Sequence, residues 1–189
     1  MAVRISTGQP IPLARRSNFI KVLTGVPLIE QEESNWCWAA AADMVLDFCG
    51  QPNVRQCDLA KELFSRRDCC GAASSDFDKC NKGAEAEDLS PLFAARNVKS
   101  KLKKASVAFV KLTTEINRDQ PVQVAFRWEG SDGGHVVIIK GYGRDLRDGT
   151  ELLSINDPWP PFESELNGQV EYDSLLDAYG RGALSKKKA

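Results

Sequence analysis

The apolar and polar positions along the chain predict mainly helices in its first two thirds and a sheet in its last third. Apolar residues three and four positions apart predict helices at residues 37–46, 54–65, 87–97, 109–118 and 172–179. Alternation or a short apolar run predicts strands at residues 98–102, 121–128, 135–142 and 150–156. The polar segment 144–149 joins the last two strands as a hairpin. Helices followed by a sheet favour an α+β fold with two lobes.

One predicted helix is apolar on nearly every side, because Ala39–Ala42 is followed by Met44, Val45 and Leu46. Ser34 or Asn35 is a candidate N-cap for it. We expect a central, buried helix with Cys37 in its first turn. At that end of a helix the dipole favours the negatively charged thiolate over the thiol.

The two ends of the chain have a different character from the middle. Residues 1–22 predict an extended, basic lead-in that contains proline, and residues 22–31 predict a strand or an extended arm. The last residues, 183–189, predict a disordered basic tail. We therefore expect one folded domain at residues 23–182, and the lead-in is a candidate pro-segment that is removed.

The composition is that of an ordinary globular domain. The chain has 189 residues, of which 42% are hydrophobic and 27% charged, and its formal net charge is −1. This length supports a real core, and the near-neutral balance argues against a nucleic-acid partner. No apolar stretch approaches the ~20 residues of a membrane span, and the N-terminus lacks the pattern of a signal peptide. We expect a monomer, either cytoplasmic or exported by a route that needs no leader.

Four polar residues stand in settings that indicate shared chemistry. Gln31 lies six residues before Cys37, which opens the apolar helix between two tryptophans. His135 is the only histidine of the chain, and it follows two glycines at the start of an apolar strand. Asp157 ends the next strand, just before a proline. Together they predict a thiolate nucleophile, an imidazole base, a carboxylate that orients the base, and a glutamine amide that binds an oxyanion.

With these motifs the chain resembles the papain-clan cysteine peptidases. The resemblance rests on Gln31, on Trp36-Cys37-Trp38-Ala39, on Gly134-His135-Val136-Val137 with Gly141-Tyr142-Gly143, and on Asp157-Pro158. It is closest to the compact bacterial branches, which include effector proteases and double-glycine leader peptidases. It implies a helical lobe, an antiparallel sheet lobe and a cleft between them, where peptide or isopeptide bonds are hydrolysed through an acyl-enzyme. Candidate residues of that cleft are Trp38, Gly134 and Trp159, and the core is the alternative place for the two tryptophans.

The third member of the triad has two candidates, Asn156 and Asp157. Papain has an asparagine at this place, whereas the compact bacterial relatives have an aspartate before a proline. Alternation along the strand groups Asp157 with Leu153 and Ile155, and we expect that face to point towards His135. We therefore favour Asp157 over Asn156.

Each motif also has a reading without catalysis. A cysteine in an apolar helix is usually a buried, inert thiol, and a histidine in an apolar strand is usually a core residue with its hydrogen bonds satisfied. Asp157-Pro158 can be a simple turn. The combination of the motifs outweighs these readings.

The other cysteines leave several arrangements open. Besides Cys37 they are Cys49, Cys57, Cys69, Cys70 and Cys80. A disulfide between Cys70 and Cys80 would close a short loop. Free thiols are the second reading. Zinc is the third and is disfavoured, because Cys69-Cys70 lacks the usual spacing and no second histidine is present. No metal and no cofactor are expected.

The sequence thus predicts a cysteine endopeptidase that acts on a protein or peptide substrate, with no membrane partner. Two other classes stay open. A transglutaminase-like acyl transferase has the same order of Cys, His and Asp, and a catalytically inert binding module can share the fold. The cleavage specificity is not encoded in any motif that we identify.

Overall fold

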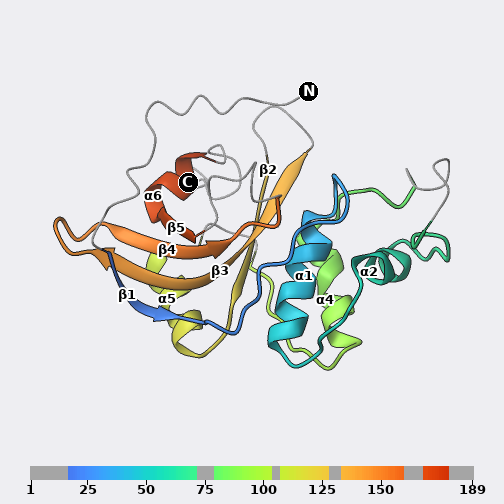
Figure 1. Cartoon of the computed structure of the whole chain (residues 1–189), viewed down its shortest axis with the longest axis horizontal. Helices are drawn as coiled ribbons and strands as arrows, with labels where there is room; N and C mark the ends of the chain where they lie inside the picture. Colours follow the sequence, from blue (N-terminus) through green and yellow to red (C-terminus); the bar gives the residue numbers. More distant parts are fainter. Residues whose placement is uncertain (1–16, 72–78, 104–106, 128–132, 160–167, 179–189) are drawn as a thin grey trace.

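The computed structural model has two lobes, one helical and one built on a sheet (Figure 1). It describes residues 17–71, 79–103, 107–127, 133–159 and 168–178. The helical lobe contains α1 (Cys37–Phe48), α2 (Gln56–Leu63) and α4 (Ala86–Ala94). Helices α5 (Phe109–Asn117) and α6 (Tyr172–Ala178) pack on the sheet instead. The α+β, two-lobed architecture predicted from the sequence is confirmed.

The sheet of the described residues is antiparallel. Its strands are β1 (Ser17–Val22), β2 (Val122–Arg127), β3 (Gly134–Asp145), β4 (Glu151–Asn156) and β5 (Gly168–Glu171). The order is β1-β3-β4-β5, and β2 also pairs with β3. Strand β3 is long enough for two partners on one edge, because β2 pairs with its first half and β1 with its second half, while β4 pairs along the other edge. This central strand carries His135.

The approach of β1 to β3 explains two glycines of the motif Gly141-Tyr142-Gly143. A Cβ at Gly143 would lie 2.5 Å from the carbonyl oxygen of Asn18, and a Cβ at Gly141 would lie 2.8 Å from that of Lys21. Both oxygens belong to β1, so the two glycines allow the backbones to come close. The pairing also shifts register between Phe19 and Lys21.

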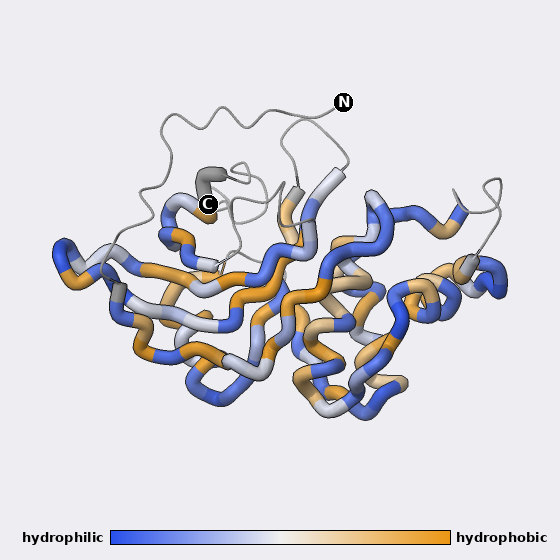
Figure 2. Tube along the Cα trace, in the orientation of Figure 1, coloured by the Kyte–Doolittle hydropathy of each residue, from blue (hydrophilic) through white to orange (hydrophobic). Residues whose placement is uncertain are grey.

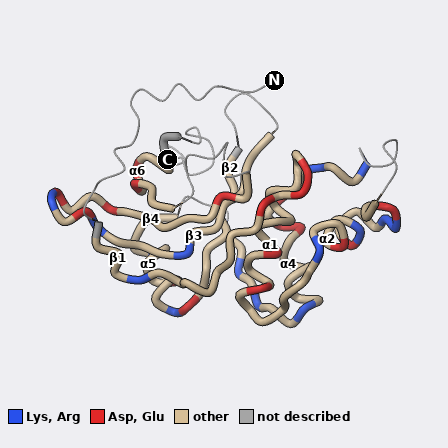
Figure 3. The backbone as a smooth tube through the Cα atoms, in the orientation of Figure 1, with Lys and Arg blue, Asp and Glu red and all other residues tan. Residues whose placement is uncertain are grey.

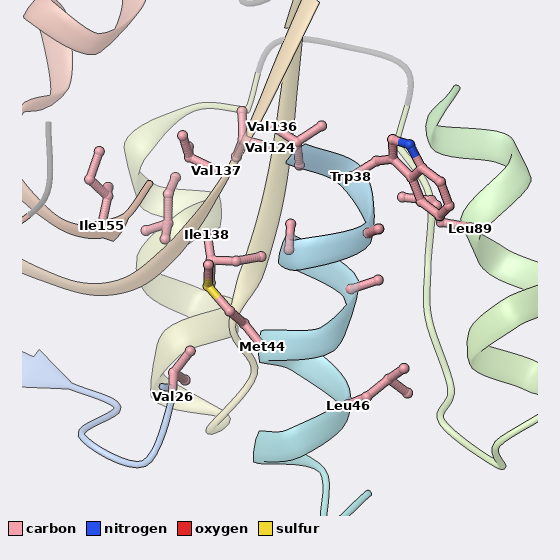
Figure 4. Close-up of a cluster of buried hydrophobic side chains, with 14 of the residues drawn as sticks. Val26, Trp38, Met44, Leu46, Leu89, Val124, Val136, Val137, Ile138 and Ile155 are labelled. Carbon is pink, nitrogen blue, oxygen red and sulfur yellow. The ribbon is translucent and has the colours of Figure 1, made fainter. Parts of the chain in front are cut away.

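Helix α1 lies where the two lobes meet. Its alanines and Met44 are fully buried, because the helix is covered by β3 on one side and by α2 and α4 on the other. Figure 4 shows Met44 pointing towards Ile138 of β3, while Trp38 points towards Leu89 of α4. Hydrophobic residues continue along β3 and β4, as Figure 2 shows. The core thus holds the first turn of α1 against the sheet.

The outer turns and loops carry charged residues of both signs (Figure 3). This distribution agrees with the net charge of −1. Among the described residues, none of the helices has the length and apolar character that crossing a membrane requires.

The predicted helices all overlap observed ones, but three details differ. The segment 98–102 is not a strand; Lys99, Lys101 and Leu102 are exposed, and no described strand pairs with them. Strand β5 was not predicted, because it is only four residues long. The N-cap of α1 is Trp36 without a side-chain cap, since Ser34 and Asn35 bond to Asn81 instead.

The predicted lead-in overlaps the sheet. Its last residues, 17–22, form β1 and pair with the second half of β3. The rest of the lead-in, residues 1–16, and the predicted tail at 183–189 lie outside the described residues.

The predicted disulfide between Cys70 and Cys80 is wrong. The structure instead pairs Cys57 with Cys70 and Cys69 with Cys80. Cys69 reaches the buried Cys80, while its neighbour Cys70 reaches Cys57 on α2, so the two adjacent cysteines have partners in different segments. The sulfurs in these disulfides are not thiolates, so they do not form the ligand set that zinc requires.

Candidate active site

The first residue of α1 and the ends of two neighbouring strands meet at the candidate site. Cys37 begins α1, His135 is the second residue of β3, and Asp157 directly follows β4. Strands β3 and β4 pair with Ile138 opposite Asn156, which brings the start of one strand beside the end of the other. The topology therefore gathers three residues that are far apart in the sequence.

His135 and Asp157 form a buried pair. The distance from His135 Nε2 to Asp157 Oδ1 is 2.6 Å, and the two residues are only 6% and 3% exposed. Asp157 Oδ1 also accepts a hydrogen bond from the backbone N–H of Trp159 at 2.9 Å. The indole of Trp159 stands edge-on to the imidazole, with ring centroids 5.9 Å apart. The carboxylate is thus fixed from two directions and shielded from water.

The side chain of Cys37 lies close enough to the imidazole of His135 to raise its pKa. Because Asp157 occupies Nε2, the other ring nitrogen, Nδ1, is the one available to the sulfur. Burial lowers the pKa of His135, but the hydrogen bonds and negative charges of Asp157 and Cys37 outweigh it and raise the pKa from 6.5 to about 9. The site therefore favours the protonated form of the His135 imidazole.

Asn156, the rival of Asp157, has other partners. Its Nδ2 donates to the carbonyl oxygens of Val26 at 3.3 Å and Pro27 at 2.6 Å. Both residues belong to the arm that leads to Gln31. Alternation along β4 does not distinguish the two residues, because both faces of the strand are buried. The hydrogen bonds nevertheless place Asp157, and not Asn156, at the imidazole.

Gln31 is buried beside this pair. Its backbone N–H donates to the carbonyl oxygen of Pro158 at 2.8 Å, next to Asp157. Its side-chain Nε2 donates to the carbonyl oxygen of Glu33 at 2.7 Å, which fixes the orientation of the amide. Within the described residues, Gln31 Oε1 is buried and has no hydrogen-bond partner. One N–H of the amide is anchored, and the second has no acceptor in the part of the chain that the structure describes.

Comparison with known proteins gives the family of the chain. The model of the family described as "Peptidase_C39 like family" matches residues 23–182. The chain belongs to the Peptidase_C39 like family. Membership indicates a papain-like cysteine peptidase, and hence a protein or peptide substrate. No curated protein matches the sequence.

The three predicted cleft residues of this family member differ in their accessibility. Trp38 is 0% exposed, its indole N–H donates to the carbonyl oxygen of Lys82, and its ring packs edge-on against Phe64. The prediction that Trp38 lines the cleft is therefore wrong; it is part of the helical core. Gly134 is exposed and Trp159 half-buried, and both adjoin the His135–Asp157 pair.

A cavity of about 640 Å³ lies elsewhere in this peptidase-family fold. Residues of α1, α4 and β2 line it, together with the segment 97–102, and they include Val45, Phe93 and Gln123. Cys37, His135 and Asp157 are not among its lining residues. The candidate active site is the group Cys37, His135 and Asp157 and not this cavity, because the chemistry depends on the nucleophile and its base.

Two polar residues outside the predicted site bond to the segments that flank it. Gln56 bonds to the backbone on both sides of Gln31, and Asn81 bonds to Asn35, two residues before Cys37. Neither stands in a motif. The only signal is that each adjoins a cysteine, Cys57 and Cys80.

Proposed function

We propose that this protein is a cysteine endopeptidase that hydrolyses peptide or isopeptide bonds through an acyl-enzyme on Cys37. The observation that carries the proposal is the series Cys37–His135–Asp157 at the junction of the two lobes, in which Cys37 is half-buried and His135 and Asp157 are buried. A nucleophile bonded to a base that is itself oriented by a third group is the arrangement of activated nucleophiles.

In the first half of the reaction, the Cys37 thiolate attacks the carbonyl carbon of the scissile bond. The carbonyl oxygen becomes an oxyanion, which accepts hydrogen bonds from the Cys37 backbone N–H and the Gln31 amide. The first N–H groups of a helix have no intrahelical acceptor, so that of Cys37 is free for this role. The His135 imidazolium then donates its proton to the leaving nitrogen, and the carbon–nitrogen bond breaks.

In the second half, water replaces the amine. Neutral His135 takes a proton from the water molecule, and the water oxygen attacks the carbonyl carbon of the thioester. The carbon–sulfur bond breaks, the acid product leaves, and the thiolate and imidazolium are restored. Asp157 stays ionised throughout, keeps Nδ1 directed at the sulfur, and stabilises the imidazolium.

Site-mapped alkylation with a peptidyl epoxide at graded pH tests the proposal. We expect Cys37 to be labelled selectively well below pH 7, and His135→Ala to abolish that selectivity. Cys49, the other free cysteine among the described residues, is an internal control, because burial raises the pKa of its thiol. Equal labelling of Cys37 and Cys49 that follows ordinary thiol ionisation would contradict the proposal.

Product analysis distinguishes hydrolysis from the acyl-transferase alternative. A peptide substrate is incubated with a primary amine, and the products are identified by mass spectrometry. Hydrolysis gives the free acid and the amine fragment. Incorporation of the added amine without net cleavage would instead assign acyl transfer to the same acyl-enzyme.

A further inference from the structure

Gln56 makes a two-bond clamp on the segment that carries Gln31. It is the first residue of α2, and it is only 1% exposed. Its Nε2 donates to the carbonyl oxygen of Glu30 at 2.7 Å, and its Oε1 accepts from the N–H of Glu32 at 3.0 Å. One amide therefore holds the peptide groups on both sides of Gln31, and the direction of the Gln31 side chain is fixed by them.

Asn81 makes a similar clamp on the segment before Cys37. Its Oδ1 accepts from the backbone N–H of Asn35 at 2.9 Å, and its Nδ2 donates to Ser34 Oγ at 2.9 Å. In return, the Asn35 side chain donates to the carbonyl oxygen of Asn81 at 3.0 Å. These bonds fix the turn that enters α1, and hence the direction of the Cys37 N–H.

Two tryptophans add to the second clamp. The indole N–H of Trp36 donates to the carbonyl oxygen of Cys80, and that of Trp38 donates to the carbonyl oxygen of Lys82, both at 2.9 Å. Both rings are buried, so these bonds are protected from competing water. The segment 80–82 is thus attached to both neighbours of Cys37.

The two clamps are joined covalently. Gln56 adjoins Cys57, Cys57 pairs with Cys70, Cys69 pairs with Cys80, and Cys80 adjoins Asn81. Because Cys69 and Cys70 are neighbours, two disulfides and a few peptide bonds connect one clamp to the other. We call this unit the brace, and define it as Gln56-Cys57, Cys69-Cys70 and Cys80-Asn81.

We propose that Gln56 and Asn81 are positioning residues for the two oxyanion donors, and that the disulfides of the brace hold those donors at a fixed separation. This inference rests on the proposed function, because it assigns the Gln31 amide and the Cys37 N–H to the oxyanion. Among the described residues, the bonds of the clamps reach the segments of Gln31 and Cys37 and not His135 or Asp157. The brace therefore acts on oxyanion binding and leaves the thiolate–imidazolium pair intact.

Two reagents separate these effects. A peptide aldehyde forms a thiohemiacetal on Cys37, and its oxygen takes the place of the oxyanion. Iodoacetamide alkylates the thiolate without forming an oxyanion. A change confined to oxyanion binding alters the aldehyde affinity and kcat but not the alkylation rate, whereas general loosening of the fold alters all three.

The first experiment compares Gln56→Leu with wild type and with the control Gln51→Leu. Gln51 is exposed, and its side chain makes no hydrogen bond within the described residues. For Gln56→Leu we expect kcat and aldehyde affinity to fall about tenfold or more, since losing a whole oxyanion donor costs ~10²–10³ in rate. KM and the alkylation rate of Cys37 stay near wild type, and Gln51→Leu changes none of these quantities.

Gln56→Glu is the second variant and is scored if Gln56→Leu does not fold. It keeps the oxygen that accepts from Glu32 and loses the donor to Glu30, so the same selective loss is expected.

Asn81→Ala tests the other clamp with the same readouts. The brace is opened by Cys69→Ser with Cys80→Ser and not by a reductant, because a reductant also changes the oxidation state of Cys37. For Asn81→Ala and for the double cysteine variant we expect kcat and aldehyde affinity to fall while the alkylation rate of Cys37 stays near wild type.

The outcomes separate this inference from the function on which it rests. Wild-type aldehyde affinity and kcat in folded Gln56 and Asn81 variants would overturn the positioning roles and leave the peptidase intact. A parallel fall of alkylation and aldehyde binding would also overturn them, because it indicates a general structural role. Absence of selective Cys37 labelling in wild type would instead remove the proposed function itself, and the inference with it.

Discussion

Asn156 and Asp157 are neighbours in the chain, and their side chains bond to opposite parts of the active-site region. Asp157 accepts from His135 Nε2 at 2.6 Å, whereas Asn156 donates to the carbonyl oxygens of Val26 and Pro27. The end of β4 therefore both orients the base and anchors the arm that leads to Gln31. Asp157 therefore contacts the candidate base, whereas the neighbouring Asn156 holds the backbone of the arm.

The first prediction follows from this difference between the two residues. Asp157→Asn should lower kcat/KM by about 10²–10⁴, because the imidazolium loses its ionic partner and its fixed orientation. Asn156→Ala should instead lower the free energy of unfolding by about 1–3 kcal/mol, since two backbone acceptors lose their donor. Denaturant unfolding and steady-state kinetics on both variants measure the two effects. The reverse assignment, with Asn156 controlling turnover, would make Asn156 the third member of the triad.

The second prediction concerns pH. The pKa of His135 is raised from 6.5 to about 9, so the imidazolium persists through neutral pH, and the alkaline limb of kcat/KM should lie near pH 9. Asp157→Asn should move this limb towards lower pH. The substitution removes the carboxylate of Asp157, which contributes most to raising the pKa of His135. Burial of the imidazole, the largest single cause, still lowers that pKa. A pH profile with a limb near 6.5 in wild type would contradict the prediction.

The same ionisation affects folding. Because the folded-state pKa of His135 lies above the unfolded value, its contribution to stability is complete below about pH 6.5 and is lost as the pH rises through about 9. We expect the difference in unfolding free energy between wild type and His135→Ala to shrink across this interval. Denaturant titrations at pH 6 and pH 9.5 measure it. A difference that grows with pH would show that the shift has the opposite sign.

The third prediction concerns Gln31. Gln31→Ala should reduce kcat by about 10²–10³ and leave a measurable rate, because the Cys37 N–H remains as the second donor. Alkylation of Cys37 by iodoacetamide should be unchanged, since that reaction forms no oxyanion. Full activity of Gln31→Ala in a steady-state assay would remove Gln31 from the oxyanion site.

The fourth prediction concerns the close approach of β1 and β3. Gly143→Ala should lower the free energy of unfolding by about 1–3 kcal/mol, because the new Cβ would lie 2.5 Å from the carbonyl oxygen of Asn18. Gly83→Ala is the matched control, since a Cβ there meets nothing within 4 Å. Thermal melting of both variants tests the pair. Equal melting temperatures would show that β1 moves aside without cost.

Local patterns were sufficient to predict much of the fold. The apolar run after Cys37 predicted a buried helix, and α1 begins at that residue. The alternation before Asp157 predicted the strand that places it near His135. These features are determined by residues that are close together in the chain, so they can be predicted from a single sequence.

Pairings between distant segments could not be predicted in the same way. The disulfides depend on which side of the backbone Cys69 and Cys70 face, and no spacing rule determines that. The indole of Trp38 looked suited to a cleft wall, but the carbonyl oxygen of Lys82 holds it in the core. The roles of Gln56 and Asn81 are equally hidden, because each depends on backbone groups brought together only by the fold.

His135 is the only histidine of the chain, and this has a practical consequence. The ring protons of histidine resonate in a sparse part of the proton NMR spectrum, and here they come from one imidazole. A protein without a polyhistidine tag therefore reports the ionisation of its candidate base directly, with no assignment step. Inhibitors, clamp variants and substrates can each be added to that one sample, and the same two signals follow the site throughout.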